Sequence, residues 1–467
     1  MAQRINAIDA MFLDESSEDG PPLAIGTCLV LPGRAPRVSD VRELLASKKA
    51  IMPRLFQRLR PSRVDGILRP SWVDADPDLR HHVTVCHIGD EPRGLAGAVA
   101  KVMERPMDRS RPLWDVTLFP ELPDAPGWGL VFRVHHTVAD GEAAVMLLGH
   151  LCDMKPNGGV TVTQAGMAVP SAHHGPTQSP SPTDEGREKP TSPREALRSA
   201  MGRLSASVES VQEVARRIPD TARSLSNFAP RKATGLTGTP SDGRSWAVVE
   251  SPLASVKAAG SPAGGTVNDV ILAACAIGFT AVLRRRGSDP SGQVVRCFMP
   301  ISLRDAGDTT ASNQVSILPV PLPVGVDGLR EVLASVHEAT SIAKASLSPS
   351  ISGMLGGVVT ALVPNRLEEL AGAEAPRFGG HFGDVCITNV IGPPLPVFFM
   401  GREVASMYPI LPIGQPLMLG VSIFSYNGKL EITVTGDDKS WGDVELLART
   451  INGVLNGPVS RPTPDSG

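Results

Sequence analysis

The chain has 467 residues, of which 42% are hydrophobic and 20% are charged, and its formal net charge is −3. This length and composition suit two soluble domains, each with a core of its own. The near-neutral charge gives no reason to expect a nucleic-acid partner. The 6 cysteines are widely spaced and form no C-x-x-C pair, so we expect reduced, buried thiols and no metal site.

Residues 1–154 alternate strand-like and helix-like segments, which predicts a first α/β domain. The expected strands are residues 23–31, 83–86, 116–119 and 131–134, and the expected helices are residues 38–48, 95–104 and 143–152. The N-terminus lacks the apolar core of a signal peptide. The longest apolar runs, 270–283 and 354–363, are shorter than the ~20 residues that span a bilayer, so we expect no transmembrane segment.

The composition changes after residue 154. Residues 155–195 are rich in Pro, Ser, Thr, Gly and Gln, which predicts a low-complexity linker. Residues 196–244 follow as an amphipathic helix and connector, because apolar residues recur at spacings of three and four until Pro219 interrupts them. We favour a helix packed on the body of the protein, and the alternative is a surface helix that touches lipid.

A second α/β domain is expected over residues 245–456, followed by a disordered tail over 457–467. A helix is expected at 270–283. The expected strands of this domain are residues 246–250, 294–299, 315–319, 384–388, 416–424 and 430–435.

The most informative stretch is residues 131–141, with the sequence VFRVHHTVADG. A buried strand that ends here would hold His135 and His136 at the edge of a cavity. An imidazole with an ordinary pKa near ~6.5 is suited to take a proton from a hydroxyl at neutral pH. Asp140 can brace the turn that presents His136, and Gly141 permits a tight backbone. The pattern indicates activation of a hydroxyl by a general base.

Two other histidine pairs lack this context. Residues 173–174 lie in Ser/Pro-rich sequence and are given no role. Residues 81–82 precede a strand-like run, but no Asp-Gly follows them. Paired histidines near a strand are often structural, so the acid and the glycine in order are what favour residues 135–141.

Further motifs lie elsewhere in the chain. Trp114, in Pro112-Leu113-Trp114, is interpreted mainly as a core anchor beside the strand of His135. Asn268 and Asp269 open the helix at 270–283, where capping explains them, although an amide side chain there can also donate to an oxyanion. Arg304 ends a strand and can pair with a buried carboxylate. Residues 425–428 predict an Asn-Gly hairpin turn.

Taken in order, these motifs resemble the bacterial wax ester synthase/diacylglycerol acyltransferase family over nearly the whole chain. Related acyltransferases and peptide-synthetase condensation domains share the histidine block, so the ordered set carries the resemblance. Two features depart from the family pattern: the long 155–195 stretch, and Thr388, where the family commonly has serine. The resemblance is carried by residues 8–13, 112–114, 135–141, 268–269, 300–304, 388–393 and 425–428.

The resemblance implies two chloramphenicol-acetyltransferase-like α/β domains with mixed sheets and an active-site channel between them. It implies transfer of a fatty acyl group from acyl-coenzyme A to an alcohol, with no cofactor and no metal. His136 would be the general base, His135 would line the site or tune its partner, and Asp140 would shape the turn, for example by pairing with Arg304. The implied substrate-binding residues are Gly141, Asn268, Asp269, Trp114 and Arg304.

Several alternatives stay open at this stage. The acceptor is diacylglycerol, which would give triacylglycerol, or a long-chain alcohol, which would give a wax ester. A related enzyme with another acceptor or acyl carrier, or a non-catalytic lipid-binding member of the fold, would share the sequence pattern, although the intact histidine block argues against the latter. Arg284, Arg285 and Arg286 would meet the phosphates of coenzyme A or only complement the helix dipole. We expect a cytoplasmic protein, peripheral on the inner membrane face or on lipid droplets.

Overall fold

The computed structural model describes residues 4–5, 9–10, 12–13, 22–61, 70–123, 125–159, 161–162, 236, 238, 241–302, 315–345, 383–414 and 417–457. The amphipathic helix expected at 197–218, Arg304, and nearly all of the expected linker and tail lie outside these residues.

The N-terminal half is built on a five-stranded mixed sheet with the strand order β13-β1-β6-β5-β4. β4 pairs with β5 in parallel, and the other neighbours are antiparallel. The strands are β1 (Ala24–Leu31), β4 (Val83–Val85), β5 (Trp114–Phe119), β6 (Trp128–His135) and β13 (Ser406–Ile410). The other elements are α2 (Val38–Ser47), η1 (Pro53–Phe56), β2 (Gln57–Arg60), β3 (Ser71–Asp74), α3 (Leu79–His82), α4 (Gly94–Glu104) and α5 (Gly141–Leu151).

β6 is the central strand of this sheet, and all of its residues are buried. A strand covered on both faces needs a nearly continuous apolar sequence, and WGLVFRVH meets that need except at Arg133 and His135. Arg133 is compensated by the carboxylate of Asp115 on the neighbouring strand. The strand ends at His135, so the sheet fixes the backbone of the histidine pair.

The C-terminal half is built on a six-stranded sheet with the order β7-β15-β14-β10-β8-β9. β10 is parallel to both of its neighbours, so this sheet is also mixed. Its strands are β7 (Arg244–Pro252), β8 (Val294–Ser302), β9 (Val315–Pro323), β10 (Val385–Ile391), β14 (Leu419–Tyr426) and β15 (Lys429–Asp437). The remaining elements are α8 (Leu253–Gly260), η2 (Ser261–Ala263), α9 (Val267–Arg285), α10 (Leu329–Ala345), β11 (Phe398–Phe399), β12 (Arg402–Glu403) and α13 (Val444–Asn456).

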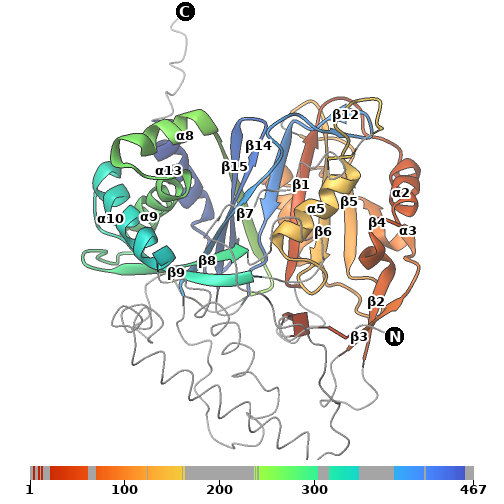
Figure 1. The fold of residues 1–467 in the computed structure, drawn as a ribbon, viewed down its shortest axis with the longest axis horizontal. Helices are drawn as coiled ribbons and strands as arrows, with labels where there is room; N and C mark the ends of the chain where they lie inside the picture. The colour runs from red at the N-terminus through yellow and green to blue at the C-terminus, as the bar shows by residue number, and fades with distance from the viewer. Residues whose placement is uncertain are drawn as a thin grey trace, which may run out of the picture.

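The two sheets stand side by side, with α8, α9, α10 and α13 gathered on the outer side of the second sheet (Figure 1). α9 is the central helix of this layer and packs against α10 and α13. It is long and apolar enough to cross a membrane, but 72% of its most apolar window is buried inside the protein. Burial on nearly all sides explains its apolar sequence, so α9 is a core helix.

β13 connects the two halves. It follows β12 in the C-terminal half, yet it pairs antiparallel with β1 and forms the edge of the N-terminal sheet. Its backbone also contacts the second sheet, because the amide of Met407 donates to Glu431 and the carbonyl of Pro409 accepts from Ser422. Part of the 245–456 segment therefore completes the first sheet and fixes one half against the other.

Candidate active site

The histidine motif occupies the loop between β6 and α5. The amide of His136 donates to the carbonyl of Leu23 at 2.8 Å, and the amide of Val138 donates to the carbonyl of His135 at 2.8 Å. The chain therefore turns sharply just after the strand, at the two histidines. The turn is fixed in place because the end of the central strand β6 pairs with the start of β1.

His135 is buried, with 2% of its surface exposed. The amide of Thr137 donates to its Nδ1 at 3.2 Å, so Nδ1 is an acceptor and the neutral ring carries its proton on Nε2. Burial, together with the charges of His136, Arg109 and Arg133, lowers the pKa of His135 to about 3. A base this weak cannot hold a proton taken at neutral pH, so His135 is suited to line the site.

His136 is only half-buried and lies in a different environment. The ring of Phe12 stacks on its imidazole, with 4.0 Å between the ring centroids and 20° between the ring planes. Of the two motif histidines, His136 is therefore the one that is not fully buried. This is the geometry expected of a base that meets a substrate hydroxyl.

Asp140 is the N-cap of α5. Its Oδ1 accepts a hydrogen bond of 2.8 Å from the amide of Ala143, and 1% of the residue is exposed. The carboxylate also lies at the positive end of the helix dipole. The predicted brace is thus present as a helix cap, whereas the proposed partner Arg304 lies outside the described residues.

Gly141 begins α5 with ordinary helical geometry, so the expectation that glycine serves a tight backbone here is wrong. A Cβ atom at this position would lie 3.8 Å from Cγ2 of Val390. Val390 is on β10, and it packs against the core of the N-terminal half. The first turn of α5 therefore faces the C-terminal sheet, which places the motif at the junction of the two halves.

Asn268 and Asp269 lie in the first turn of α9. The Oδ1 of Asn268 accepts from Nδ2 of Asn389 at 2.8 Å, which ties the helix to β10. Asp269 is fully buried and forms a capping box with Thr266. Two side chains of α10 also contact this carboxylate: Nδ1 of His337 at 2.9 Å and Oγ1 of Thr340 at 2.7 Å. These contacts are structural, and an oxyanion contact by Asn268 stays a prediction.

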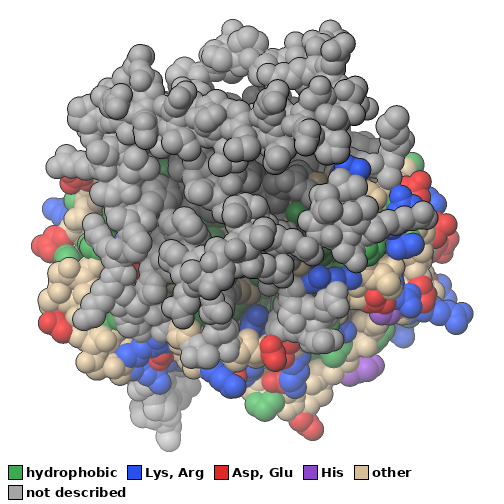
Figure 2. Space-filling view, turned by 90° about the horizontal axis from the view of Figure 1, so that it is seen from below, with side chains coloured by type: hydrophobic (Ala, Val, Ile, Leu, Met, Phe, Trp, Pro, Cys, Tyr) green, Lys and Arg blue, Asp and Glu red, His purple; other side chains and the backbone are tan. Residues whose placement is uncertain are grey.

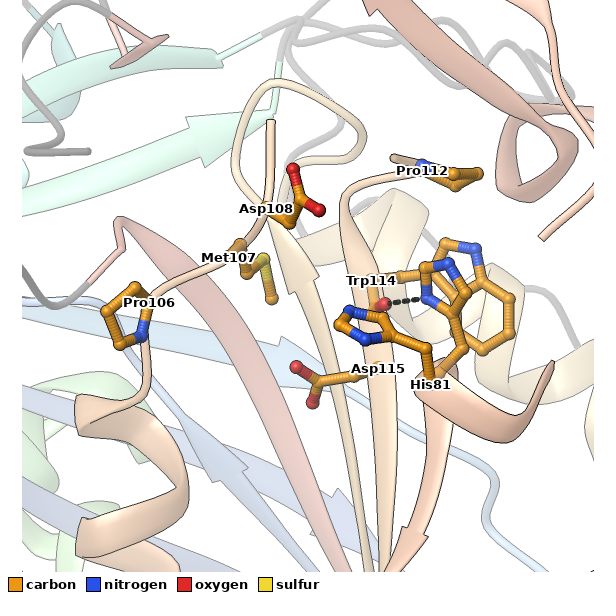
Figure 3. Close-up of a pocket in the computed structure, with 8 residues that line it drawn as sticks. His81, Pro106, Met107, Asp108, Pro112, Trp114 and Asp115 are labelled. Atoms are coloured by element: carbon orange, nitrogen blue, oxygen red, sulfur yellow. Dashed lines mark hydrogen bonds between the residues drawn. The ribbon is translucent and has the colours of Figure 1, made fainter. Parts of the chain in front are cut away.

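Trp114 is the core anchor that the sequence predicts. It is 2% exposed, its Nε1 donates to the carbonyl of Leu55 at 2.7 Å, and the ring of His82 stacks on it at 4.6 Å. Figure 3 shows that Trp114 also forms part of the wall of a pocket of about 270 Å³. This pocket is lined by His81, His82, Pro106, Met107, Asp108, Pro112, Trp114 and Asp115.

The three arginines at the end of α9 are engaged by carboxylates. Arg284 forms two hydrogen bonds with Asp327, at 2.8 Å and 3.1 Å. Arg285 and Arg286 both pair with Asp443, at 3.3 Å and 2.8 Å. They lie at the opposite end of α9 from Asn268, about 25 Å away at the rise of an α-helix, so they stabilise the helix end rather than the motif.

The arrangement of two mixed α/β halves with a histidine motif at their junction has counterparts among solved structures. The wax ester synthase/diacylglycerol acyltransferase from Marinobacter aquaeolei matches 97% of this chain and 98% of its own length, with a TM-score of 0.67 and 22% identity. The starter condensation domain of rhizomide synthetase matches 97% of this chain and 94% of its own, with a TM-score of 0.59 and 16% identity. The predicted chloramphenicol-acetyltransferase-like fold is confirmed.

Residues 5–271 match the wax ester synthase/diacylglycerol acyltransferase catalytic domain, and residues 311–457 match the C-terminal domain of the same family. A probable diacylglycerol O-acyltransferase of Mycobacterium tuberculosis is 30% identical over 454 residues, which cover 96% of this chain and 94% of that protein. The chain belongs to the wax ester synthase/diacylglycerol acyltransferase family. It is an acyltransferase of triacylglycerol and wax ester metabolism, as the resemblance predicts.

Proposed function

We propose that the protein transfers a long-chain fatty acyl group from acyl-coenzyme A to the free hydroxyl of diacylglycerol, with His136 as general base. The observation that carries this proposal is the contrast between the two motif histidines. Burial lowers the pKa of His135 to about 3, whereas His136 is half-buried at the junction of the two halves. The diacylglycerol acceptor is supported by the names of relatives that are 30% identical to the chain.

The reaction follows from a neutral imidazole beside an alcohol and a thioester. His136 takes the hydroxyl proton as the oxygen attacks the thioester carbonyl, which forms the C–O bond of a tetrahedral intermediate. The intermediate collapses, the C–S bond breaks, and coenzyme A leaves with the electron pair on sulfur. The imidazolium then returns its proton to the thiolate, which restores the neutral base and releases the free thiol. His135, fixed by Thr137, lines the site beside it.

A long-chain alcohol is the second candidate acceptor, because the similar Marinobacter aquaeolei protein carries both activities in its name. Purified protein should be given labelled palmitoyl-coenzyme A with equal amounts of diacylglycerol and hexadecanol, and the products separated by chromatography. We expect triacylglycerol to exceed wax ester. The reverse ratio would favour the alcohol. If folded protein makes neither ester, the catalytic proposal fails and a lipid-binding role is favoured.

We also propose that the protein works in the cytoplasm at a lipid surface, because both candidate acceptors are insoluble in water. In the described residues, the exposed large apolar side chains are dispersed: Ile51, Val85, Val248, Ile342 and Leu395. Figure 2 shows basic and acidic side chains interspersed over the described part of the underside. The proposal therefore takes the second reading of the predicted helix at 197–218, a surface helix whose arginines meet lipid; if the helix packs on the body instead, glutamate at Leu204 and Val208 will destabilise the fold.

The surface proposal is tested by co-sedimentation of the full chain with anionic liposomes. Each basic residue near an anionic surface adds ~1 kcal/mol, so we expect reversible binding that salt partly releases. Replacing Leu204 and Val208 with glutamate should weaken binding while a water-soluble short-chain alcohol is still acylated. Wild-type protein that stays in the supernatant at low salt would contradict the proposal.

A further inference from the structure

Phe12 covers one face of the imidazole that we assign as the base. Its ring is stacked on His136, with centroids 4.0 Å apart and planes 20° from parallel. Phe12 lies on a helical turn that includes Asp9, Ala10 and Leu13, all less than a tenth exposed. Nη2 of Arg109 donates to the carbonyl of Leu13 at 3.0 Å, so the turn is held in place by the loop before β5.

A stacked ring leaves the chemistry of an imidazole open. The lone pair and the N–H of histidine lie in the ring plane, whereas Phe12 contacts the ring face, so proton transfer is not blocked. When His136 takes a proton, a cation lies against the face of an aromatic ring. Such a contact within about 6 Å is favourable, and more so where water is excluded.

We infer that Phe12 is a positioning residue for His136: it holds the imidazole in the orientation for proton transfer and stabilises the imidazolium that forms. The inference rests on the proposed role of His136 as general base. A phenyl ring stabilises the imidazolium through its π face and adds no charge of its own beside the base.

The charged and titratable groups around the pair stay unchanged when Phe12 is replaced. Among the described residues they include His135 and Asp140 of the motif, Arg109 and Arg133, whose charges act on His135, and Asp9 on the turn of Phe12 itself. A change in the pH profile of a Phe12 variant therefore reports the aromatic contact.

The test compares Phe12→Leu, Phe12→Tyr and, as a matched control, Phe398→Leu at a half-buried phenylalanine on β11. We expect Phe12→Leu to lower kcat roughly 2- to 30-fold, the range for a lost cation–π contact, with KM unchanged for both substrates. The base acts in its neutral form, so activity falls as pH drops through its pKa. Loss of the aromatic face lowers that pKa, and the acidic limb of the profile should move to lower pH.

Phe12→Tyr keeps the aromatic face, so its kcat and the acidic limb of its pH profile should be close to those of wild type. Phe398→Leu should also match wild type. A double variant, His136→Ala with Phe12→Leu, should be no slower than His136→Ala alone, because Phe12 acts through His136. If Phe12→Leu fails to fold, Phe12→Met takes its place.

The inference is overturned if folded Phe12→Leu keeps the wild-type kcat and pH profile. It is also overturned if kcat falls together with the melting temperature while the acidic limb stays in place, since the contact would then be only structural. Full activity in His136→Ala would instead refute the proposed base, whatever the Phe12 variants do. The two failures are therefore distinguishable.

Discussion

Two adjacent histidines of the same motif have been given different environments by the strand that carries them. His135 is the last residue of β6 and shares the burial of that strand, while His136 lies beyond its end and is half-buried. A buried imidazole with a pKa of about 3 stays neutral throughout the physiological range. Because β6 ends between them, His135 lines the site and His136 is the proposed base.

We predict that His136→Ala lowers kcat by ~10²–10⁴-fold, the usual contribution of a general base, without unfolding the protein. His135→Ala should reduce activity less, through loss of packing and of its contacts with Thr137. The exposed His87 gives the control, because His87→Ala should leave turnover unchanged. The measurement is initial rate with palmitoyl-coenzyme A, and an activity above about a tenth of wild type in His136→Ala would contradict the assignment.

Two substitutions of Asp140 separate the contribution of its helix cap from that of its negative charge. Asparagine caps helices about as well as aspartate, so Asp140→Asn should keep more stability than Asp140→Ala. We expect Asp140→Ala to lower the free energy of unfolding by about 0.5–2 kcal/mol, with activity falling in parallel as the β6–α5 loop loosens. Urea unfolding measures both variants. Equal losses in the two would show that the negative charge, and not the cap, is what stabilises this loop.

Residue roles that depend on a short stretch of sequence could be predicted, whereas contacts between distant parts of the chain could not. His136 and the capping aspartate lie within one short motif, and their roles follow from strand, turn and helix signals. Phe12 and Val390 contact that motif from opposite ends of the chain, and no local pattern pairs them with it. The one available signal was the position of Phe12 inside the first stretch that resembles the family.

At the scale of elements, the start of α9 is joined to α10 by hydrogen bonds to one buried carboxylate. Thr266 and Asp269 satisfy each other's backbone amides in a capping box, and Asp269 then reaches across to His337 and Thr340 on α10. Burial opposes ionisation, yet these hydrogen bonds lower the pKa of Asp269 below its ordinary value. One carboxylate therefore holds the end of one helix and its packing against another.

We predict that Asp269→Asn lowers the free energy of unfolding at pH 7 by about 1.5–3 kcal/mol, the usual contribution of hydrogen bonds to a charged group. The folded pKa is depressed, so this stabilisation is present above the unfolded pKa near ~3.9 and is lost as pH falls through the folded value. The gap between wild type and variant should therefore be present at pH 7 and narrow below about pH 4. Urea titrations at several pH values measure it.

The exposed Asp90 provides the matched control, because Asp90→Asn removes a carboxylate without removing a buried contact. Its stability should follow wild type at each pH. A gap for Asp269→Asn that persists unchanged at pH 3 would mean that the ionised carboxylate is not the stabilising form.

Elements with a clear period or cap were predictable, and those defined by long-range pairing were not. β1, β6 and α9 lie within a few residues of their expected bounds because their sequences are continuously apolar. α13 was missed although Val444, Leu447, Ala448 and Ile451 recur at helical spacing, so a signal was present. β13 carries no such signal, since its strand is created by pairing with β1.

At the scale of the whole molecule, the crossing strand β13 joins the two sheets over a buried acid. Glu431 on β15 accepts from the amide of Met407, and no part of the residue is exposed. Glu250 is its register partner on β7 and accepts from the hydroxyls of Ser406 and Tyr408. Two acids from the second sheet thus hold the strand that completes the first.

Its buried site in the folded protein favours the protonated form of Glu431. Burial raises its pKa to about 8, Glu250 adds to the rise, and the Met407 amide and Lys429 only partly offset them. Its Oε1 has no hydrogen-bond partner among the described residues, so an ionised carboxylate would be poorly satisfied here. Folding therefore favours the bound proton, and the junction is expected to weaken as that proton is lost.

We predict that Glu431→Gln removes the loss of stability at alkaline pH, because glutamine stays neutral and keeps an acceptor for the amide of Met407. Because the folded pKa lies above the unfolded value, the wild-type protein retains the full contribution of the protonated acid below about pH 4 and loses it progressively up to about pH 8. The glutamine variant should match wild type near pH 4 and exceed its free energy of unfolding by roughly 1–4 kcal/mol at pH 9. Glu445→Gln on the exposed face of α13 is the control. Equal stability of Glu431→Gln and wild type at pH 9 would show that the ionised carboxylate finds a partner beneath β13.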